Sequence, residues 1–253
     1  VNNRRMRILD ILNERKGAKV AELGSELEVS LVTVRRDLDY LDGKGFLVRR
    51  HGGALPIQSS ADSVPEKKLE EKDDINIEEK SAIAARAARE VKDGDTLFMN
   101  SGSTVLLFLR ALKGKRVKVI TNNAAAIMAE RDPGIELLIL GGEYREQSRS
   151  LVGEFALSTI KNIYSGCSFL GTNGLSLERG LTTSVYQECS INQAMIANTH
   201  EKVIVLADYS KLGKISNFVS APLSSVDIVI TDDKCPEDFR KGLEALGIDV
   251  IIA

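Results

Sequence analysis

The sequence predicts an α/β protein in which an N-terminal winged helix-turn-helix precedes a larger, mostly parallel α/β domain. Three helical segments and a glycine-bounded strand occupy residues 1–56. From Ile75 onward, short β-rich apolar runs alternate with helical segments, which is typical of a parallel sheet covered on both faces. A polar stretch with a dense charge run separates the two patterns, so we place the domains at 1–56 and 75–253 with a linker at 57–74.

Charge is divided unevenly between the two parts of the chain. Residues 1–58 hold 11 Lys and Arg against 8 Asp and Glu, whereas the remainder holds 23 against 28. A basic small segment joined to an acidic larger one suits a DNA-binding head on a soluble body. The length of 253 residues allows one large or two ordinary domains, and a hydrophobic content of 43% is ample for their cores.

Cysteine and histidine usage argues against metal and disulfide chemistry. The three cysteines (Cys167, Cys189 and Cys235) are widely spaced without a CxxC pair, and His51 and His200 are the only histidines. We therefore expect reduced thiols, no metal site and no cofactor. No apolar run reaches about 18 residues, so we expect a cytoplasmic protein without a membrane span.

The head begins with two amphipathic helices. Residues 3–15 carry a broad apolar face and end at a Lys-Gly pair, and residues 20–27 form a second, shorter helix. Ser30 is placed to cap a third helix that begins at Leu31. A weakly alternating strand at 46–50, bounded by two glycines, then predicts a hairpin, so the three helices are followed by a wing.

The third helix divides sharply into two faces. At 3.6 residues per turn, one stripe is apolar and must be buried; it consists of Leu31, Val34, Leu38 and Leu41. The opposite face suits base edges and phosphates in a major groove; it carries Val32, Thr33, Arg36 and Tyr40, with Arg35 at the flank.

These patterns indicate a DNA interface made from the third helix and the wing. The candidate DNA-binding residues are Ser30, Val32, Thr33, Arg35, Arg36, Tyr40, Arg50, His51 and Gly52, with Arg49 also near phosphates. The alternative is a small helical domain with a solvated charged face. Asp39 follows Arg35 by four residues, so that arginine could instead belong to a surface ion pair.

The body alternates between strands and helices. Helices are expected at 81–91, 105–112, 123–131, 155–163, 190–199 and 236–246. Strands are expected at 96–99, 117–120, 135–140, 168–170, 203–206, 226–230 and 249–251. Ligands in such sheets bind outside the carboxyl ends of the strands, so the loops at those ends are the candidate site.

Small polar residues gather at five of these strand ends. Asn100 and the four residues after it lead directly into a helix, where backbone N–H groups and hydroxyls form an anion cradle. Each loop alone could be an ordinary turn. Together they favour a pocket for a phosphorylated sugar, lined by Ser101, Gly102, Ser103, Thr104, Thr121, Asn122, Gly141, Gly142, Asn173, Gly174, Glu188 and Lys211.

Several charged residues of the body could instead serve acid-base chemistry. They are Glu143, Glu178, Glu188, Asp208 and Lys211, and an isomerase needs such a group close to a substrate carbon. They could equally be surface charges or hydrogen-bond partners of a ligand. No GxxxxGK[ST] nucleotide loop is present, and no GxGxxG follows a strand.

Several short motifs are distributed over nearly the whole chain. They are Thr33-Val34-Arg35-Arg36-Asp37-Leu38, Arg50-His51-Gly52-Gly53-Ala54, Glu78-Glu79-Lys80, Ser101-Gly102-Ser103-Thr104, Gly180-Leu181-Thr182-Thr183 and Asp208-Tyr209-Ser210-Lys211. Through these motifs the chain resembles the DeoR-type bacterial transcriptional regulators of sugar metabolism. The resemblance implies a sensor domain similar to ribose-5-phosphate isomerase and glucosamine-6-phosphate deaminase, with a phosphorylated sugar as inducer. Asn100 stands where the family often has Asp, and Ser103 where Thr is common.

The expected function is therefore sequence-specific DNA binding by a transcriptional regulator, usually a repressor, under control of a phosphorylated sugar. Its expected partners are a double-stranded DNA operator, the sugar effector and further copies of the chain in a dimer or tetramer. We expect no catalytic residues. The alternatives are a sugar-phosphate isomerase or deaminase that carries a winged helix, and a scaffold whose head binds protein.

Overall fold

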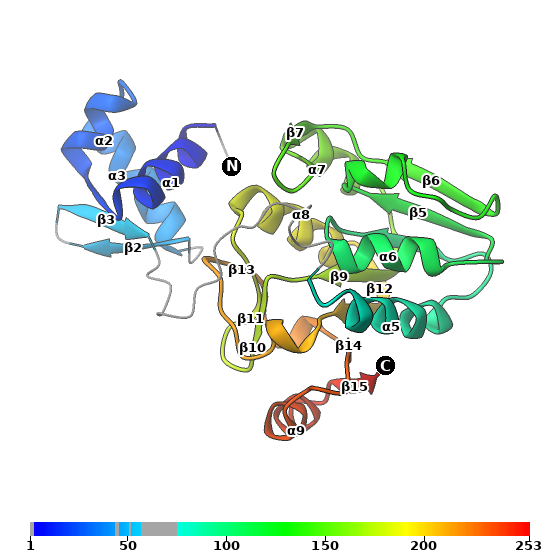
Figure 1. The fold of residues 1–253 in the computed structure, drawn as a ribbon. Coiled ribbons are helices and arrows are strands. Elements are labelled where there is room, and N and C mark those ends of the chain that lie inside the picture. Colours follow the sequence, from blue (N-terminus) through cyan, green and yellow to red (C-terminus); the bar gives the residue numbers. More distant parts are fainter. Residues whose placement is uncertain (1–2, 44–45, 51, 57–74) are drawn as a thin grey trace.

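The computed structural model of the protein describes residues 3–43, 46–50, 52–56 and 75–253 (Figure 1). The expected linker at 57–74 and His51 lie outside the described residues. The head consists of α1 (Asn3–Arg15), α2 (Val20–Glu26) and α3 (Leu31–Gly43), with strands β1 (Ala18–Lys19), β2 (Leu47–Arg50) and β3 (Gly53–Pro56). The strands form an antiparallel sheet in the order β1-β3-β2, which confirms a winged helix-turn-helix.

Helix α3 starts and packs largely as its sequence predicts. The Ser30 hydroxyl accepts a hydrogen bond from the Thr33 N–H at 3.2 Å, so Ser30 caps the helix. Val34, Leu38 and Leu41 are fully buried. The prediction was wrong for Leu31, which is 44% exposed because it is the first residue of the helix and only its tip rests over Gly24.

A buried carboxylate fixes α3 to α1. The two oxygens of Asp37 accept hydrogen bonds from Nε of Arg4 and Nε of Arg5, each at 2.6 Å, and the Asp37 side chain is 2% exposed. Burial alone would raise the pKa of Asp37, but the two guanidinium groups outweigh it and hold that pKa below its usual range. The charged form of Asp37 therefore stabilises the folded head.

We expect Asp37→Asn to lower the free energy of unfolding at pH 7 by about 2 kcal/mol, the scale of hydrogen bonds to a charged group. Since the folded pKa lies below the unfolded value of about 3.9, the contribution is present above that value and is lost as the pH falls through the folded pKa. Urea unfolding at pH 7 and near pH 3 measures this. Asp39→Asn is the matched control, because Asp39 is 68% exposed in its ion pair. Equal effects of the two substitutions would contradict the assignment.

The body is built on a seven-stranded sheet in the order β15-β14-β12-β9-β4-β5-β6, and every neighbouring pair is parallel. The strands are β4 (Thr96–Met99), β5 (Val117–Thr121), β6 (Ile135–Ile139), β9 (Ser165–Gly171), β12 (Thr199–Leu206), β14 (Ile228–Thr231) and β15 (Asp249–Ile252). The chain adds strands in one direction from β4 and then in the other from β9. The topological switch point therefore lies between β4 and β9, where α/β sheets bind ligands.

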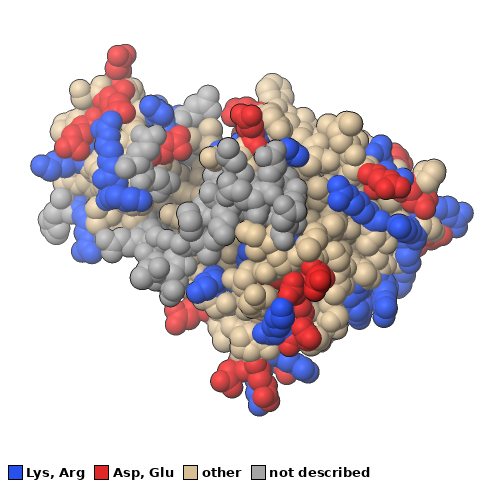
Figure 2. All heavy atoms as spheres, in the orientation of Figure 1, with Lys and Arg blue, Asp and Glu red and all other residues tan. Residues whose placement is uncertain are grey.

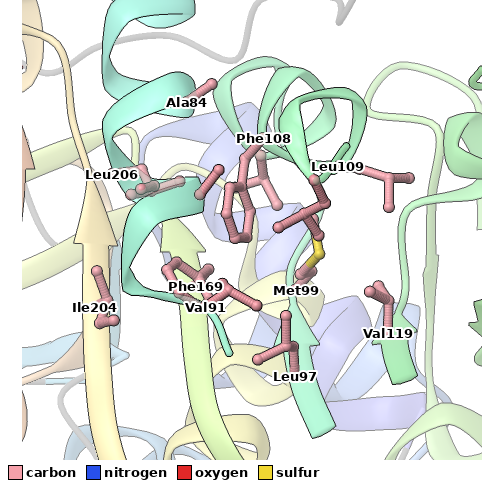
Figure 3. Close-up of a cluster of buried hydrophobic side chains, with 14 of the residues drawn as sticks. Ala84, Val91, Leu97, Met99, Phe108, Leu109, Val119, Phe169, Ile204 and Leu206 are labelled. Atoms are coloured by element: carbon pink, nitrogen blue, oxygen red, sulfur yellow. The ribbon is translucent and has the colours of Figure 1, made fainter. Parts of the chain in front are cut away.

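Helices cover both faces of this sheet (Figure 1). One face packs under α5 (Ile77–Ala87) and α6 (Ser103–Ala111), around Phe108 and Phe169, whose ring centroids are 4.3 Å apart (Figure 3). The other face packs under α7 (Glu154–Ile160) and α8 (Tyr186–Ala197), and continues under α9 (Glu237–Ala245). Short 3-10 turns occur at Ala88–Glu90, Ala124–Ile127, Tyr209–Lys211 and Leu223–Ser225.

The body departs from its sequence prediction in several places. The helix expected at 123–131 is only the turn Ala124–Ile127, whose first N–H donates to the Arg149 carbonyl of a hairpin. That hairpin, β7 (Glu143–Arg145) and β8 (Ser150–Val152), was not expected. Nor was a small antiparallel sheet of β10 (Gly174–Ser176), β11 (Gly180–Thr183) and β13 (Phe218–Ala221). Both α5 and α8 begin four residues earlier than predicted.

Within the described residues, every helix is too short or too polar to cross a lipid bilayer.

Candidate functional site

The exposed face of α3 presents the residues expected to contact bases. Val32 is 57% exposed, and Arg35 and Arg36 are also exposed. Asp39 pairs with Arg49 of β2 at 2.6 Å, not with Arg35, which corrects the alternative drawn from their spacing. The same Arg49 donates to the Arg35 carbonyl at 3.3 Å, so the wing is attached directly to α3.

Other candidate DNA contacts have partners or roles within the head. The Tyr40 ring stacks under the guanidinium of Arg5, with 3.9 Å from Cζ to the ring centroid, and stays 39% exposed. Ser30 is engaged in capping. Arg50 and Gly52 lie exposed at the wing, and Gly52 has φ +81, a left-handed turn conformation that favours glycine. Figure 2 shows several Lys and Arg side chains on the head surface.

A cleft opens at the switch point of the body, at the carboxyl ends of β4, β9 and β12. Its lining is strongly polar. The lining residues are Lys80, Asn100, Ser101, Gly102, Ser103, Thr104, Ser148, Gly171, Thr172, Asn173, Thr183, Glu188, Asn192, Leu206, Asp208 and Lys211.

One wall of the cleft is an anion cradle. Gly102 precedes α6, and Ser103 and Thr104 form its first turn with side chains turned inward. The helix start presents free backbone N–H groups and the positive end of the helix dipole. Two ammonium groups line the same cleft: Lys80, which is 3% exposed on α5, and Lys211. This combination suits a phosphate.

Carboxylates line the cleft as well. Glu188 accepts a hydrogen bond from the Ser150 hydroxyl at 2.9 Å, and that hydroxyl lies 2.8 Å from the Ser148 hydroxyl. Asp208 is buried and accepts from the Asn76 amide at 2.9 Å and from the Ser210 N–H at 3.0 Å. Lys211 Nζ lies 3.9 Å from Asp208 Oδ2. Both carboxylates can accept hydrogen bonds from ligand hydroxyls at the edge of the anion cradle.

Asn100 joins three elements at the floor of the cleft. Its amide donates to the Gly171 carbonyl and to Asn192 Oδ1, both at 2.9 Å, and its oxygen accepts from the Gly171 N–H at 2.8 Å. An aspartate could accept the bond from Gly171 but could not donate the other two. Asn100 therefore orders the ends of β4 and β9 and holds α8 against them.

Seven of the twelve predicted effector residues line this cleft; they are Ser101, Gly102, Ser103, Thr104, Asn173, Glu188 and Lys211. The structure places the other five outside it, and these are Thr121, Asn122, Gly141, Gly142 and Gly174.

Backbone contacts explain four of the residues placed outside. The Thr121 hydroxyl accepts from the Asn123 N–H at 3.0 Å, and the Asn122 amide donates to the Leu151 carbonyl at 3.1 Å. A Cβ at Gly142 would lie 2.3 Å from the Val152 carbonyl oxygen, and one at Gly174 would lie 2.5 Å from that of Lys214. Asn122 and Gly142 lie against β8 of the β7–β8 hairpin, which brings Ser148 to the cleft and Ser150 to Glu188.

The sequence prediction missed several lining residues, among them Lys80, Ser148, Thr172, Thr183 and Asn192. Lys80 stood in a motif shared with the resembled family, which was the one signal that could have identified it. The charged residues Glu143 and Glu178, considered for acid-base chemistry, lie exposed and outside the cleft.

Comparisons with known proteins cover both domains. Residues 4–60 match the DeoR-like helix-turn-helix domain, and residues 75–233 match the DeoR C terminal sensor domain. The HTH-type transcriptional regulator GlpR of Haloferax volcanii is 33% identical over 98% of this chain and 96% of its own. The putative aga operon transcriptional repressor of Escherichia coli O157:H7 is 33% identical over 99% of this chain and 93% of the relative's length.

Among solved structures, ribose 5-phosphate isomerase A from Methanocaldococcus jannaschii overlaps 54% of this chain and 55% of its own. The overlap has a TM-score of 0.40 and 22% sequence identity. A similarity at this level does not support a functional inference.

Proposed function

The chain belongs to the DeoR family of transcriptional regulators, and we propose that it represses sugar-metabolism genes by binding an operator in duplex DNA under the control of a phosphorylated sugar. The exposed face of α3 reads bases in the major groove, and the wing contacts the backbone. The effector occupies the cleft at the switch point of the body.

The anion cradle is the observation that carries the effector assignment. A phosphate at the start of α6 accepts hydrogen bonds from backbone N–H groups and from the hydroxyls of Ser103 and Thr104. Lys80 and Lys211 supply positive charge beside it. The sugar hydroxyls then face Glu188 and Asn173, whose oxygen and nitrogen atoms match their donors and acceptors. A phosphate at one end and polyol partners at the other define a phosphorylated sugar.

The same cleft could in principle serve an isomerase or deaminase. We propose that it does not, because the position beside the cradle holds Asn100, whose amide is used in structural hydrogen bonds. A turnover assay with ribose 5-phosphate and glucosamine 6-phosphate decides between the two. If the wild-type protein converts either sugar phosphate and Glu188→Gln does not, the proposal of a non-catalytic regulator is wrong and the protein is an enzyme.

Two or four copies of the chain are proposed to act together, since paired heads read repeated half-sites one helical turn apart. Analytical ultracentrifugation with the selected duplex tests this, and a complex containing a single protomer would contradict it.

We expect Lys211→Ala to weaken effector binding about tenfold, which corresponds to about 1.4 kcal/mol for the loss of one charge-assisted contact. A thermal-shift screen with sugar phosphates measures it, because a ligand of the native state raises the midpoint in proportion to ln(1 + [L]/Kd). Lys113→Ala, an exposed lysine outside the cleft, is the control. If the ligand raises the melting temperature of wild type and of Lys211→Ala equally, Lys211 does not contact the effector.

A further inference from the structure

Helix α8 has three faces with three different neighbours. Ile191 and Met195 are fully buried against the sheet. Glu188 and Asn192, one turn apart, line the effector cleft. Tyr186 and Cys189, also one turn apart, belong to the apolar core of the head. One rigid helix of 12 residues therefore contacts both the proposed effector site and the DNA-binding domain.

The contact with the head is an aromatic cluster. The Tyr186 ring meets Phe46 edge-on, with centroids 4.6 Å apart and an interplanar angle of 87°. Phe218 of β13 completes the cluster, at 5.7 Å from Tyr186 and 6.5 Å from Phe46. All three side chains are buried, so the cluster is a packed joint between domains and not a loose surface contact.

Phe46 is attached to both DNA-contacting parts of the head. Its backbone N–H donates to the Leu41 carbonyl at 2.8 Å, which ties it to the last turn of α3. The next residue, Leu47, begins strand β2 of the wing. A displacement of the Phe46 ring is therefore passed to α3 through this hydrogen bond and to the wing through the adjoining strand.

The other end of the route lies in the cleft. Glu188 is held by the Ser150 hydroxyl, and Asn192 is held by Asn100 and, through its amide, by the Ser220 hydroxyl at 3.2 Å. A sugar that bonds to Glu188 or Asn192 competes with these partners. Because Tyr186 precedes Glu188 by two residues in the same helix, a shift of one moves the other.

We propose that the packing of Tyr186 against Phe46 is the joint through which occupation of the cleft changes the placement of the recognition helix. This inference rests on the proposed function and adds its route of control. The energy transmitted equals the difference in effector affinity between the two placements of the head, typically five- to 150-fold in affinity.

The first test uses Phe46→Leu, which keeps an apolar side chain but removes the aromatic contact. DNA affinity is measured with and without 10 mM of two probes, ribose 5-phosphate and glucosamine 6-phosphate, and the thermal shift from each probe is recorded for every variant. The control is Phe239→Leu on α9, the same chemical change in a different apolar cluster. We expect wild type and Phe239→Leu to show a probe-dependent change in DNA affinity of about five- to 150-fold. Phe46→Leu should show almost no probe-dependent change in DNA affinity. Its DNA affinity without a probe and the thermal shift that each probe causes should stay close to those of wild type. A full probe response in Phe46→Leu would overturn the proposal.

The second test needs neither effector nor DNA, so it separates failure of the joint from failure of the proposed function. The chain contains no tryptophan, and Phe46→Trp therefore places a single fluorescent reporter in the cluster. Glu188→Gln weakens the bond to Ser150 inside the cleft, and Glu237→Gln on the exposed side of α9 is the control. We expect the emission maximum of Trp at position 46 to move with Glu188→Gln and to stay fixed with Glu237→Gln. If Glu188→Gln leaves the emission maximum unchanged, a change in the cleft does not alter the packing of the aromatic cluster, and the proposal is wrong.

Discussion

Gly102→Asp is expected to abolish effector binding, with a loss of at least about 100-fold, while the protein folds and binds DNA as before. The φ of Gly102 is 166°, an extended conformation that any residue adopts, and a Cβ there would meet only Val105 Cγ2, at 3.9 Å. Aspartate is also a favoured residue at the position preceding a helix, so α6 keeps its stability. The new carboxylate, however, occupies the helix start where the phosphate is proposed to bind. Juxtaposed like charges cost several kcal/mol, and about 2.7 kcal/mol already corresponds to 100-fold.

Gly102→Asn is the matched control because it has the same shape and capping ability without the charge. Thermal shift with the sugar phosphate found in the screen, together with DNA binding by fluorescence anisotropy, distinguishes the outcomes. Strong loss in Gly102→Asp with a smaller loss in Gly102→Asn supports an anion at this helix start. If Gly102→Asp still binds the sugar phosphate, the phosphate group does not lie at the start of α6.

Arg36→Ala is expected to remove operator preference and to leave effector binding intact. Arg36 lies exposed on α3 beside Val32 and Thr33, and within the described residues it makes no ion pair that would hold it away from DNA. A well-formed arginine contact with a base is worth about 1–3 kcal/mol of discrimination, or about five- to 150-fold. The measurement is the ratio of affinities for the preferred duplex and a scrambled duplex at fixed salt.

Arg15→Ala is the control for Arg36→Ala, since Arg15 carries the same charge on the head but pairs with Glu26 at 2.7 Å. It should lower the affinity for both duplexes slightly and leave their ratio unchanged. If Arg36→Ala weakened both duplexes equally, Arg36 would be a phosphate contact. Operator choice would then rest on Val32, Thr33 and their exposed neighbours.

The sequence identified the parts of the site that are local in the chain. The run Ser101 to Thr104 follows a strand and opens a helix, so its role depends only on adjacent residues, and it lies in the cleft. Thr121, Asn122 and Gly142 also stand at strand ends but lie outside the cleft, because the β7–β8 hairpin packs on the end of β5, where Asn122 exchanges hydrogen bonds with Leu151. The hairpin is placed by contacts between distant segments, and periodicity does not reveal them.

Lys80 and Tyr186 were missed for a common reason. Each lies in a first helical turn that the sequence prediction omitted, since α5 and α8 were expected to begin at 81 and 190. Neither helix has a side-chain hydrogen bond at its cap: α5 follows Asn76 in a left-handed conformation with φ 55, and α8 follows Val185. Val185 gives no capping signal, and Asn76, although a favoured capping residue, donates its amide to Asp208 at 2.9 Å instead of capping α5.

The head shows the complementary case. Ser30 is a capping residue with its bond to Thr33 formed, and the start of α3 was predicted at the right residue. The aromatic joint could not be predicted, because Phe46, Tyr186 and Phe218 are widely separated in sequence and each resembles an ordinary core residue.

The central claim is that a sugar phosphate bound in the body controls DNA binding by the head. Its most direct test is the Kd of the full chain for a duplex selected from a random-sequence pool, at fixed salt, with and without a sugar phosphate that raises the melting temperature. We predict that this compound changes the Kd of wild type by about five- to 150-fold and leaves that of Gly102→Asp unchanged. An identical Kd for wild type with and without the bound compound would contradict the account.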